Sequence, residues 1–397
     1  MMEVPRRPDK VLTGDSHGYS IGICHRPHLA EVLYENLPDS LKSRVLTDKR
    51  VVDVEVSEYG AKVVCADGSM HEGSIVLGTD GVRSTIRQHV QALQSGIRVE
   101  DLPEQQKNPY VITYRAAFGS IPVLPGLDPG YRWDGVQDGL TTQIVQGHKR
   151  GWFGVYEKLD VPRTTYRKYT AADRAAVLDK WADLDMAPGW KVRDVRAQGT
   201  DEGGLIELEE GIMKEPWYWR RLVLAGDAVR KMEPHAGLGY NCGVSDVIAL
   251  ANGMRQLLRD CGDEAPSTAA LEKLFAQYTA ERAADTELAA EVSAKAIRLL
   301  AWLTPMHRFM AKYVIPYVPL SRWSYESKIA PFIDRAPLLE GMGERTLGVG
   351  CSPSKRHLTS RGGADGTQMA RKVSSRSREI ILAALAVLSF GLYLTQR

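Results

Sequence analysis

The sequence lacks the patterns of a metal-binding or disulfide-stabilised protein. Its 397 residues include only five cysteines, an odd number, and these form no Cys-x-x-Cys pair and no cysteine–histidine cluster. That scatter excludes a zinc site of the usual spacing and a disulfide framework. No Asn-x-Ser/Thr acceptor for N-glycosylation occurs either. We therefore expect most of the chain to face a reducing compartment and to hold no metal.

An excess of charge of one sign is also missing. Lysine and arginine number 51 against 49 aspartates and glutamates, which gives a net charge of +2. This balance gives no reason to expect nucleic acid as a partner. The first ten residues have no apolar core and do not predict a signal peptide. A chain of this length has room for two domains with cores of their own.

One long apolar run is present, at 380–394, and a basic Ser/Gly-rich segment, 351–379, precedes it. We interpret 351–379 as a linker and 380–394 as a single membrane-spanning helix. At about 1.5 Å per residue this helix covers roughly 23 Å, short of a hydrocarbon core of about 30 Å, so a buried helix is the alternative. The positive-inside rule then keeps the large N-terminal part in the cytoplasm, with the endoplasmic reticulum as the expected membrane.

Periodicity along the chain predicts an α/β fold. A strand and a helix occupy 17–37, a hairpin and a return strand into a parallel sheet follow at 44–78, and the sheet resumes at 221–225. Between them lie β-prone stretches and one helix candidate, 171–185, for which we expect a separate antiparallel layer forming one wall of a pocket. The helix after residue 237 has apolar residues at helical spacing: Val247, Ile248, Ala251, Met254, Leu257 and Leu258.

Two strand ends carry candidate ligand-binding residues. Asp227 follows the apolar run 222–225 and Gly226, where a backbone can approach a ligand closely and a carboxylate can accept hydrogen bonds from sugar hydroxyls. The next helix opens with residues whose N–H groups suit an anion: Gly237, Gly239 and Asn241. The alternative is a turn in which Asp227 merely caps that helix. Earlier in the chain, Asp-Gly-x-x-Ser-x-x-Arg follows the strand 75–77.

This pair of motifs resembles the second and third fingerprints of class A flavoprotein monooxygenases, the para-hydroxybenzoate hydroxylase type. The resemblance implies that the first motif lies near the FAD pyrophosphate and NAD(P)H, and that the second holds the ribityl chain and the flavin pyrimidine edge. The residues implied in cofactor binding are Arg26, Asp80, Gly81, Arg87, Gly226, Asp227, Pro234, Gly237, Gly239, Tyr240 and Asn241. Arg115 matches a position where related fungal enzymes place an active-site residue, with a surface arginine as the alternative.

The implied fold is α/β (α+β): an incomplete Rossmann-like FAD-binding domain interleaved with an antiparallel β substrate domain, followed by a helical region and the anchor. The corresponding segments are 1–109 and 207–300 for the FAD-binding domain, 110–206 for the substrate domain, 301–350 for the helical region, 351–379 for the linker and 380–394 for the anchor. The implied reaction is reduction of FAD by NADPH or NADH, addition of O2 at flavin C4a, and transfer of one oxygen atom to a hydrophobic substrate. The closest likeness is to fungal epoxidases and hydroxylases of terpenoid and meroterpenoid biosynthesis.

The sequence departs from this family in two places. Arg230 stands where the third fingerprint usually has histidine, and no G-x-G-x-x-G or initial βαβ unit precedes Arg26. Without that unit the adenosine end of FAD lacks its pyrophosphate cradle, so we expect a truncated gene model or fragment. A non-catalytic, membrane-anchored remnant is one alternative function. A flavin-dependent halogenase or dehydrogenase is another, although the Trp-x-Trp-x-Ile-Pro halogenase signature is not matched by 217–219.

Overall fold

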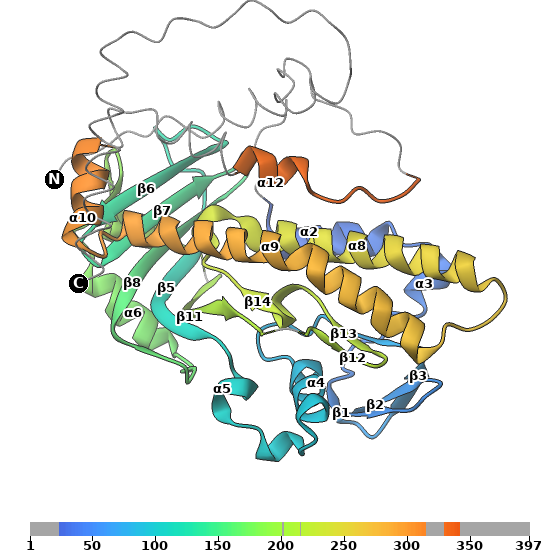
Figure 1. Ribbon diagram of the computed structural model, residues 1–397. Helices are drawn as coiled ribbons and strands as arrows, with labels where there is room; N and C mark the ends of the chain where they lie inside the picture. The colour runs from blue at the N-terminus through green and yellow to red at the C-terminus, as the bar shows by residue number, and fades with distance from the viewer. Residues whose placement is uncertain (1–23, 201, 215, 315–328, 342–397) are drawn as a thin grey trace, which may run out of the picture. The chain divides into compact units, whose positions relative to one another are not determined.

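The computed structural model describes residues 24–200, 202–214, 216–314 and 329–341. All of them fall in one compact unit. They form a six-stranded sheet, two three-stranded sheets, a two-stranded sheet and the helices that pack on them (Figure 1). The predicted linker, the predicted anchor and nearly all of the predicted strand at 19–24 lie outside the described residues. Within those ranges, no helix combines the length and the apolar character needed to cross a bilayer.

The N-terminal part confirms the predicted hairpin and return strand. A three-stranded antiparallel sheet has the order β1-β2-β3, and the chain then enters a second sheet through β4. The strand expected from residue 44 begins only at Val51, because 44–50 forms turns. The elements of this part are α2 (Arg26–Glu35), α3 (Asp39–Lys42), β1 (Val51–Val56), β2 (Ala61–Cys65), β3 (Met70–Gly73), β4 (Val76–Gly78) and α4 (Thr85–Ser95).

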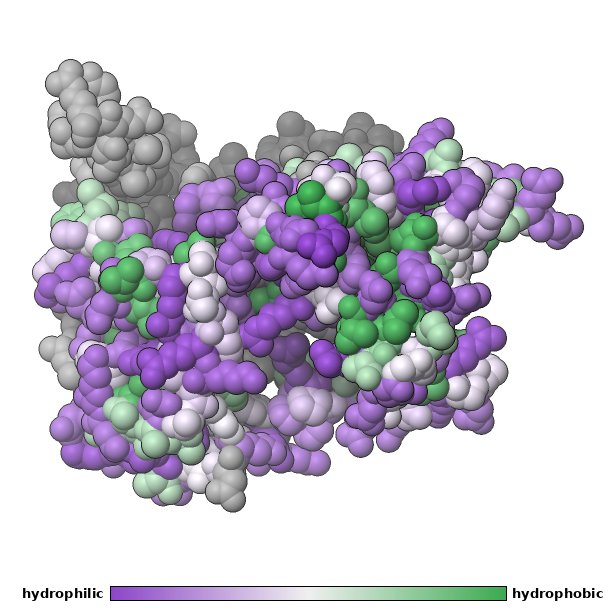
Figure 2. Space-filling model, turned by 90° about the horizontal axis from the view of Figure 1, so that it is seen from below, coloured by the Kyte–Doolittle hydropathy of each residue, from purple (hydrophilic) through white to green (hydrophobic). Residues whose placement is uncertain are grey.

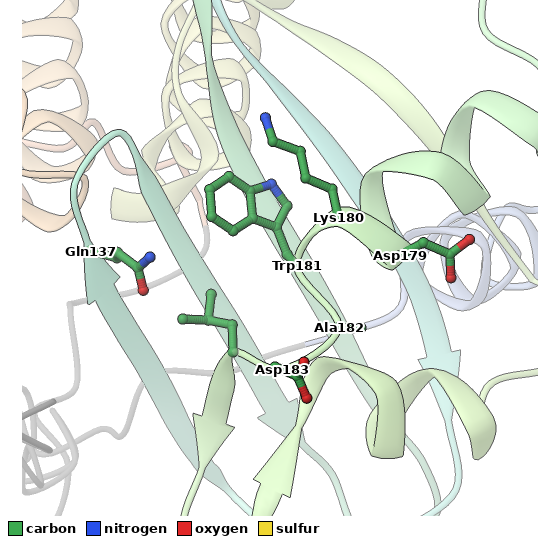
Figure 3. A pocket seen from close by; sticks show the side chains of 7 residues that line it. Gln137, Asp179, Lys180, Trp181, Ala182 and Asp183 are labelled. Carbon is green, nitrogen blue, oxygen red and sulfur yellow. The ribbon is translucent and has the colours of Figure 1, made fainter.

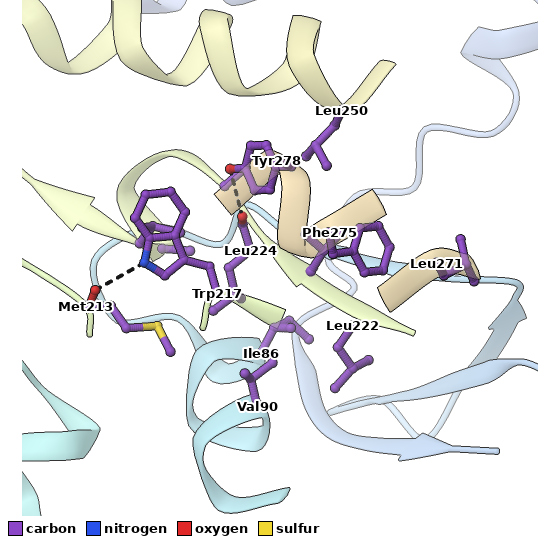
Figure 4. Close-up of a cluster of buried hydrophobic side chains, with 14 of the residues drawn as sticks. Ile86, Val90, Met213, Trp217, Leu222, Leu224, Leu250, Leu271, Phe275 and Tyr278 are labelled. Atoms are coloured by element: carbon purple, nitrogen blue, oxygen red, sulfur yellow. Dashed lines mark hydrogen bonds between the residues drawn. The ribbon is translucent and has the colours of Figure 1, made fainter. Parts of the chain in front are cut away.

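The small sheet that β4 enters has the order β12-β13-β4, with β12 (Tyr218–Trp219) and β13 (Leu222–Leu224). β13 pairs in parallel with β4 and antiparallel with β12, so the sheet does resume at 221–225 as predicted. Figure 4 shows the core beside it, in which the Trp217 indole donates to the carbonyl of Met213 and the Tyr278 hydroxyl to that of Leu224. The partnered tryptophan belongs to this core and not to a halogenase signature.

The large sheet confirms the predicted antiparallel layer. Its order is β14-β11-β5-β8-β7-β6, and every neighbouring pair is antiparallel. Its strands are β5 (Val111–Ile121), β6 (Tyr131–Gln137), β7 (Leu140–Gln146), β8 (Gly151–Arg163), β11 (Gly203–Ile212) and β14 (Arg230–Lys231). The connections include η1 (Val99–Asp101), α5 (Glu104–Lys107), α6 (Ala171–Lys180), β9 (Asp185–Ala187), β10 (Trp190–Lys191) and α7 (Val192–Ala197). The helix expected over 171–185 ends at Lys180, because the chain turns there to form β9.

Two long helices join the sheets. α8 (Leu238–Cys261) packs along α9 (Thr268–Leu300), and α9 contacts both β12 of the small sheet and β11 of the large one (Figure 1). The short segments before α8 are η2 (Gly226–Ala228) and η3 (Pro234–Ala236). After α9 come α10 (Pro305–Phe309), the π-helical turn η4 (Met310–Val314) and α12 (Ala330–Asp334). Most side chains on the face shown in Figure 2 are hydrophilic, with hydrophobic ones in small separate groups.

The buried face of α8 agrees with the predicted one only in part, since Met254 and Leu257 of the predicted stripe pack against the hydrophobic core. Val247 and Leu258, which belong to the predicted apolar stripe, are 50% and 49% exposed. The buried residues include two polar ones, and they are Leu238, Cys242, Ser245, Asp246 and Leu250. The prediction counted only apolar residues, but ion pairs made by Asp246 turn its face of the helix inward.

Candidate flavin-binding site

The fold brings the two predicted motifs to one edge of the small sheet. In the parallel pair of β4 and β13, Gly78 lies opposite Leu224, and the N–H of Ala225 donates to the carbonyl of Gly78 at 3.0 Å. The chain therefore leaves both strands at neighbouring points, towards Asp80 in one case and Asp227 in the other. The carboxyl ends of parallel strands are where α/β proteins bind ligands.

The turn after β13 presents a half-exposed carboxylate. Gly226 has a φ of +63°, a conformation that favours glycine, and Asp227 follows it in η2. The Asp227 side chain is 33% exposed and accepts a hydrogen bond from the Lys231 ammonium at 2.6 Å. It does not cap α8, whose N-cap is Gly237, so the alternative of a simple capping aspartate is wrong.

The N-terminus of α8 is open. Gly237 is left-handed, with a φ of +66°, and α8 has no side-chain cap. Its first N–H groups, which have no intrahelical acceptor in any helix, therefore receive no side-chain acceptor here either. A Cβ placed on Gly239 would meet no atom within 4 Å, and Tyr240 is 58% exposed. The amide of Asn241 donates back to the carbonyl of Gly237 at 2.9 Å. These uncapped donors and the nearby Asp227 fit FAD, which needs N–H donors at its pyrimidine edge and an acceptor at its ribityl hydroxyls.

A buried ion network holds this turn in place. The Asp246 carboxylate, fully buried, accepts from the N–H of Gly226 at 2.9 Å, from Arg230 and from Arg282 at 3.1 Å. Arg282 also pairs with Asp285 at 3.0 Å. Burial by itself lowers the pKa of Arg230, but the adjacent Asp246 carboxylate outweighs it and raises that pKa. Arg230, the departure from the family histidine, thus helps to fix the turn that carries Asp227.

The side chains of the Asp-Gly motif are used inside the protein. The Asp80 carboxylate accepts from the Ser84 hydroxyl and from the N–H groups of Thr85 and Ile86 at 2.7 and 3.2 Å, so it caps α4. The Arg87 guanidinium is fully buried, and its carbonyl acceptors include Ala228 at 2.9 Å. Arg87 therefore ties α4 to η2 and positions the site. Gly81 is the residue of this motif that borders open space, since a Cβ placed on it would meet no atom within 4 Å.

Two further predicted residues lie on other elements, Arg26 on α2 and Arg115 on β5. Arg26 opens α2 as predicted and is exposed. Arg115 lies on the face of β5 that packs against α6, since its guanidinium donates to Glu157 at 2.8 Å and Lys180 at the end of α6 donates to the same carboxylate. Successive residues of a strand point to opposite faces, and it is Tyr114 that packs with Ile297 of α9 on the other side. The expected active-site role of Arg115 finds no support in this placement.

The pocket in Figure 3 has a volume of about 260 Å³. It lies on the side of the large sheet that carries Arg115, because Lys180, which lines it, bonds the same Glu157 carboxylate as Arg115. It is lined by Gln137, Asp179, Lys180, Trp181, Ala182, Asp183 and Leu184. Its two carboxylates pair with arginines of α7, Asp179 with Arg196 and Asp183 with Arg193. None of the predicted site residues is among the residues that line this pocket, and its carboxylates are already paired. We therefore treat it as distinct from the site at the N-terminus of α8.

Sequence reasoning overlooked two buried residues beside the site. Glu233 is 1% exposed, and His235 is 6% exposed. The available signal was their position, on either side of Pro234 and immediately before the glycines.

Comparisons with known proteins agree with this geometry. Residues 210–293 match the FAD binding domain family. The chain is 31% identical to the FAD-dependent monooxygenase ausM of Penicillium brasilianum over 305 residues, 76% of this chain and 63% of that protein. It is 30% identical to the FAD-dependent monooxygenase janM of Penicillium janthinellum, over 77% of this chain and 62% of that one. The chain thus spans less than two thirds of the length of these curated relatives.

Solved structures show the same fold. HpxO of Klebsiella pneumoniae, complexed with FAD and uric acid, superposes with a TM-score of 0.52 at 20% identity, over 73% of this chain and 67% of that one. A salicylate hydroxylase substrate complex gives a TM-score of 0.51 at 18% identity, over 77% and 75%. Residues 210–293 thus match the FAD binding domain family, and the chain is similar over three quarters of its length to fungal FAD-dependent monooxygenases.

Proposed function

We propose that the protein is an FAD-dependent monooxygenase that uses NADPH or NADH and O2 to epoxidise or hydroxylate a hydrophobic terpenoid or meroterpenoid intermediate. One observation carries this proposal. The turn at Gly226–Asp227 and the uncapped N-terminus of α8 share one sheet edge, inside the segment that matches the FAD binding domain. The activity named for the fungal relatives supports the reaction class.

The roles proposed for individual residues follow from their placement. Asp227 would accept hydrogen bonds from the ribityl chain, and the first N–H groups of α8 would face the flavin pyrimidine edge. Contacts from Pro234, Tyr240 and Asn241 would complete this side. Bound FAD supplies the redox chemistry, taking electrons from NAD(P)H and activating O2. The protein orients the substrate and excludes water.

We further propose that residues 380–394 anchor the protein in a membrane, with the catalytic part on the cytoplasmic side. The basic residues of 351–379 and the apolar run after them support this topology. A tethered enzyme suits a substrate that partitions into a bilayer. Separation of membranes from soluble protein, for the full chain and for a chain ending at residue 379, tests the anchor directly. The full chain should sediment with membranes, and equal distributions would refute the anchor.

The activity is tested with the purified full chain and added FAD. We expect FAD-dependent oxidation of NADPH and, with isotopically labelled oxygen gas, one labelled atom in the product of a prenylated substrate. Asp227→Asn should abolish this, whereas Asp260→Asn, an exposed aspartate on the far end of α8, should not. NADPH oxidation without label in any product would point to a dehydrogenase, and failure to bind FAD would point to a non-catalytic remnant.

A further inference from the structure

Three buried polar groups beside the proposed site have no hydrogen-bond partner in the described part of the chain. They are both carboxylate oxygens of Glu233, both ring nitrogens of His235 and the hydroxyl of Tyr114. Their residues are 1%, 6% and 0% exposed. Leaving such a group unpaired costs about 1–3 kcal/mol, so proteins rarely bury several together without a purpose.

These groups converge on one small region. η3, which separates Glu233 from Gly237, contacts α9, and the ring of His235 meets that of Tyr156 on β8 with centroids 4.3 Å apart. Burial raises the pKa of Tyr114 to about 12, and the nearby Glu233 contributes to that rise. The groups therefore line the junction between the loop before α8 and the inner face of the large sheet, the face opposite to Arg115.

The cations near Glu233 are matched to other carboxylates. Arg298 pairs with Glu210 at 2.6 Å, and Lys231 pairs with Asp227 at 2.6 Å. Burial, reinforced by the negative charge of Glu210, raises the pKa of Glu233 well above its usual value. Burial also lowers the pKa of His235 to about 4, although Asp134, which pairs with Arg132, opposes that effect. Both shifts favour the uncharged form of the side chain.

We propose that the side chains of Glu233 and His235 bind the polar end of the substrate, and that this end is an uncharged oxygen function, a hydroxyl or a carbonyl. A carboxylic acid and a neutral imidazole each offer one donor and one acceptor, which complements such a group. A substrate carboxylate would find Arg298 and Lys231, the described cations near Glu233, already paired, and it would meet the charge of Glu210. This inference rests on the proposed function, because it places the hydrophobic remainder of the substrate beside the flavin-facing loop.

The protonated state of Glu233 is tested first, without any substrate. Infrared difference spectra of the full chain at pH 7 should show the carbonyl stretch of a protonated carboxylic acid that is lost in Glu233→Gln. The matched change at an exposed glutamate, Glu72→Gln, should leave that band in place. Identical spectra for wild type and Glu233→Gln in this region would overturn the proposal.

The selectivity is tested with three probes that share one isoprenoid chain: farnesol, farnesal and farnesoic acid. Quenching of tryptophan fluorescence should show the alcohol and aldehyde binding at least tenfold more tightly than the acid. Glu233→Gln should retain this preference, because an amide also donates and accepts, and Glu233→Leu should weaken the alcohol and aldehyde at least tenfold. Equal binding of all three probes by wild type, or unchanged binding by Glu233→Leu, would overturn the proposal.

These readouts separate the inference from the proposed function. Probe binding requires no turnover, so an inactive protein with the predicted selectivity would refute the monooxygenase and leave the polar subsite standing. Conversely, oxygen transfer with an unchanged KM in both Glu233→Leu and His235→Phe would support the enzyme and refute the subsite. Thermal melting of each variant identifies any loss of fold.

Discussion

Replacing Asp246 with asparagine tests how the turn that carries Asp227 is held. The Asp246 carboxylate is fully buried between Arg230 and Arg282, whose side chains are only 2% and 4% exposed. Asparagine has nearly the same shape as aspartate, and its side-chain oxygen can still accept from the N–H of Gly226. It is uncharged, however, so the buried guanidinium groups of Arg230 and Arg282 lose the negative charge of residue 246 that lies between them. Breaking a buried ion pair by removing one partner destabilises a protein by about 3–5 kcal/mol.

We expect Asp246→Asn to lower the melting temperature of the FAD-free protein by roughly 10 °C, followed by circular dichroism. The control is Asp260→Asn on the same helix, where the exposed carboxylate bonds only Gln256 and the change should stay within about 0.5 kcal/mol. The difference between the two variants isolates the buried charge from the general effect of an asparagine in α8. A variant at Asp246 that melts with wild type would refute the reasoning about the ion network.

Three other changes probe separate parts of the structure. Trp217→Ala should lose about 3–5 kcal/mol of unfolding free energy in denaturant titration, because the 1% exposed indole fills the core in Figure 4, whereas Trp217→Phe should lose less; equal losses would contradict this packing role. His235 binds its proton more weakly folded than unfolded, so its contribution of about 3 kcal/mol is complete above pH 6.5 and disappears as the pH falls towards 4. His235→Phe should therefore flatten the loss of stability over that range, and an unchanged pH profile would count against a buried neutral imidazole. Arg115→Met should lower stability by about 1–3 kcal/mol through loss of the Glu157 bond, with the rate of oxygen transfer unchanged; loss of oxygen transfer by a folded variant would instead favour the active-site role implied by family resemblance.

The sequence predicted those features that depend on local pattern. Apolar runs ending in Gly-Asp or Asp-Gly located β4 and β13, and β-prone segments located the antiparallel sheet. The structure contains these two strands and this sheet, because strand ends and turns are determined by residues close together in the chain. The structure adds that β4 and β13 pair with each other in parallel, which places the two motifs at one edge.

Side-chain direction required the three-dimensional structure. Arg115 lies on a correctly predicted strand, but whether an odd or even residue faces the cofactor depends on what packs against each side. The same holds for α8, where Asp246 rather than an apolar stripe decides which face is buried. Arg87 is a third case, because its long-range bond to the carbonyl of Ala228 joins residues 141 positions apart. Unpartnered groups such as those of Glu233 become visible only when every neighbour is known.

The most direct test of the flavin-binding edge is FAD binding by a variant that fills the open space at Gly239. A Cβ there meets no protein atom within 4 Å, so we expect Gly239→Leu to melt as wild type does. The control is Gly73→Leu at the exposed end of β3. Titration followed by flavin fluorescence should show FAD binding by wild type and control, and at least tenfold weaker binding by Gly239→Leu. Equal affinity of all three proteins, or no FAD binding by wild type, would contradict the assignment of this edge as the flavin site.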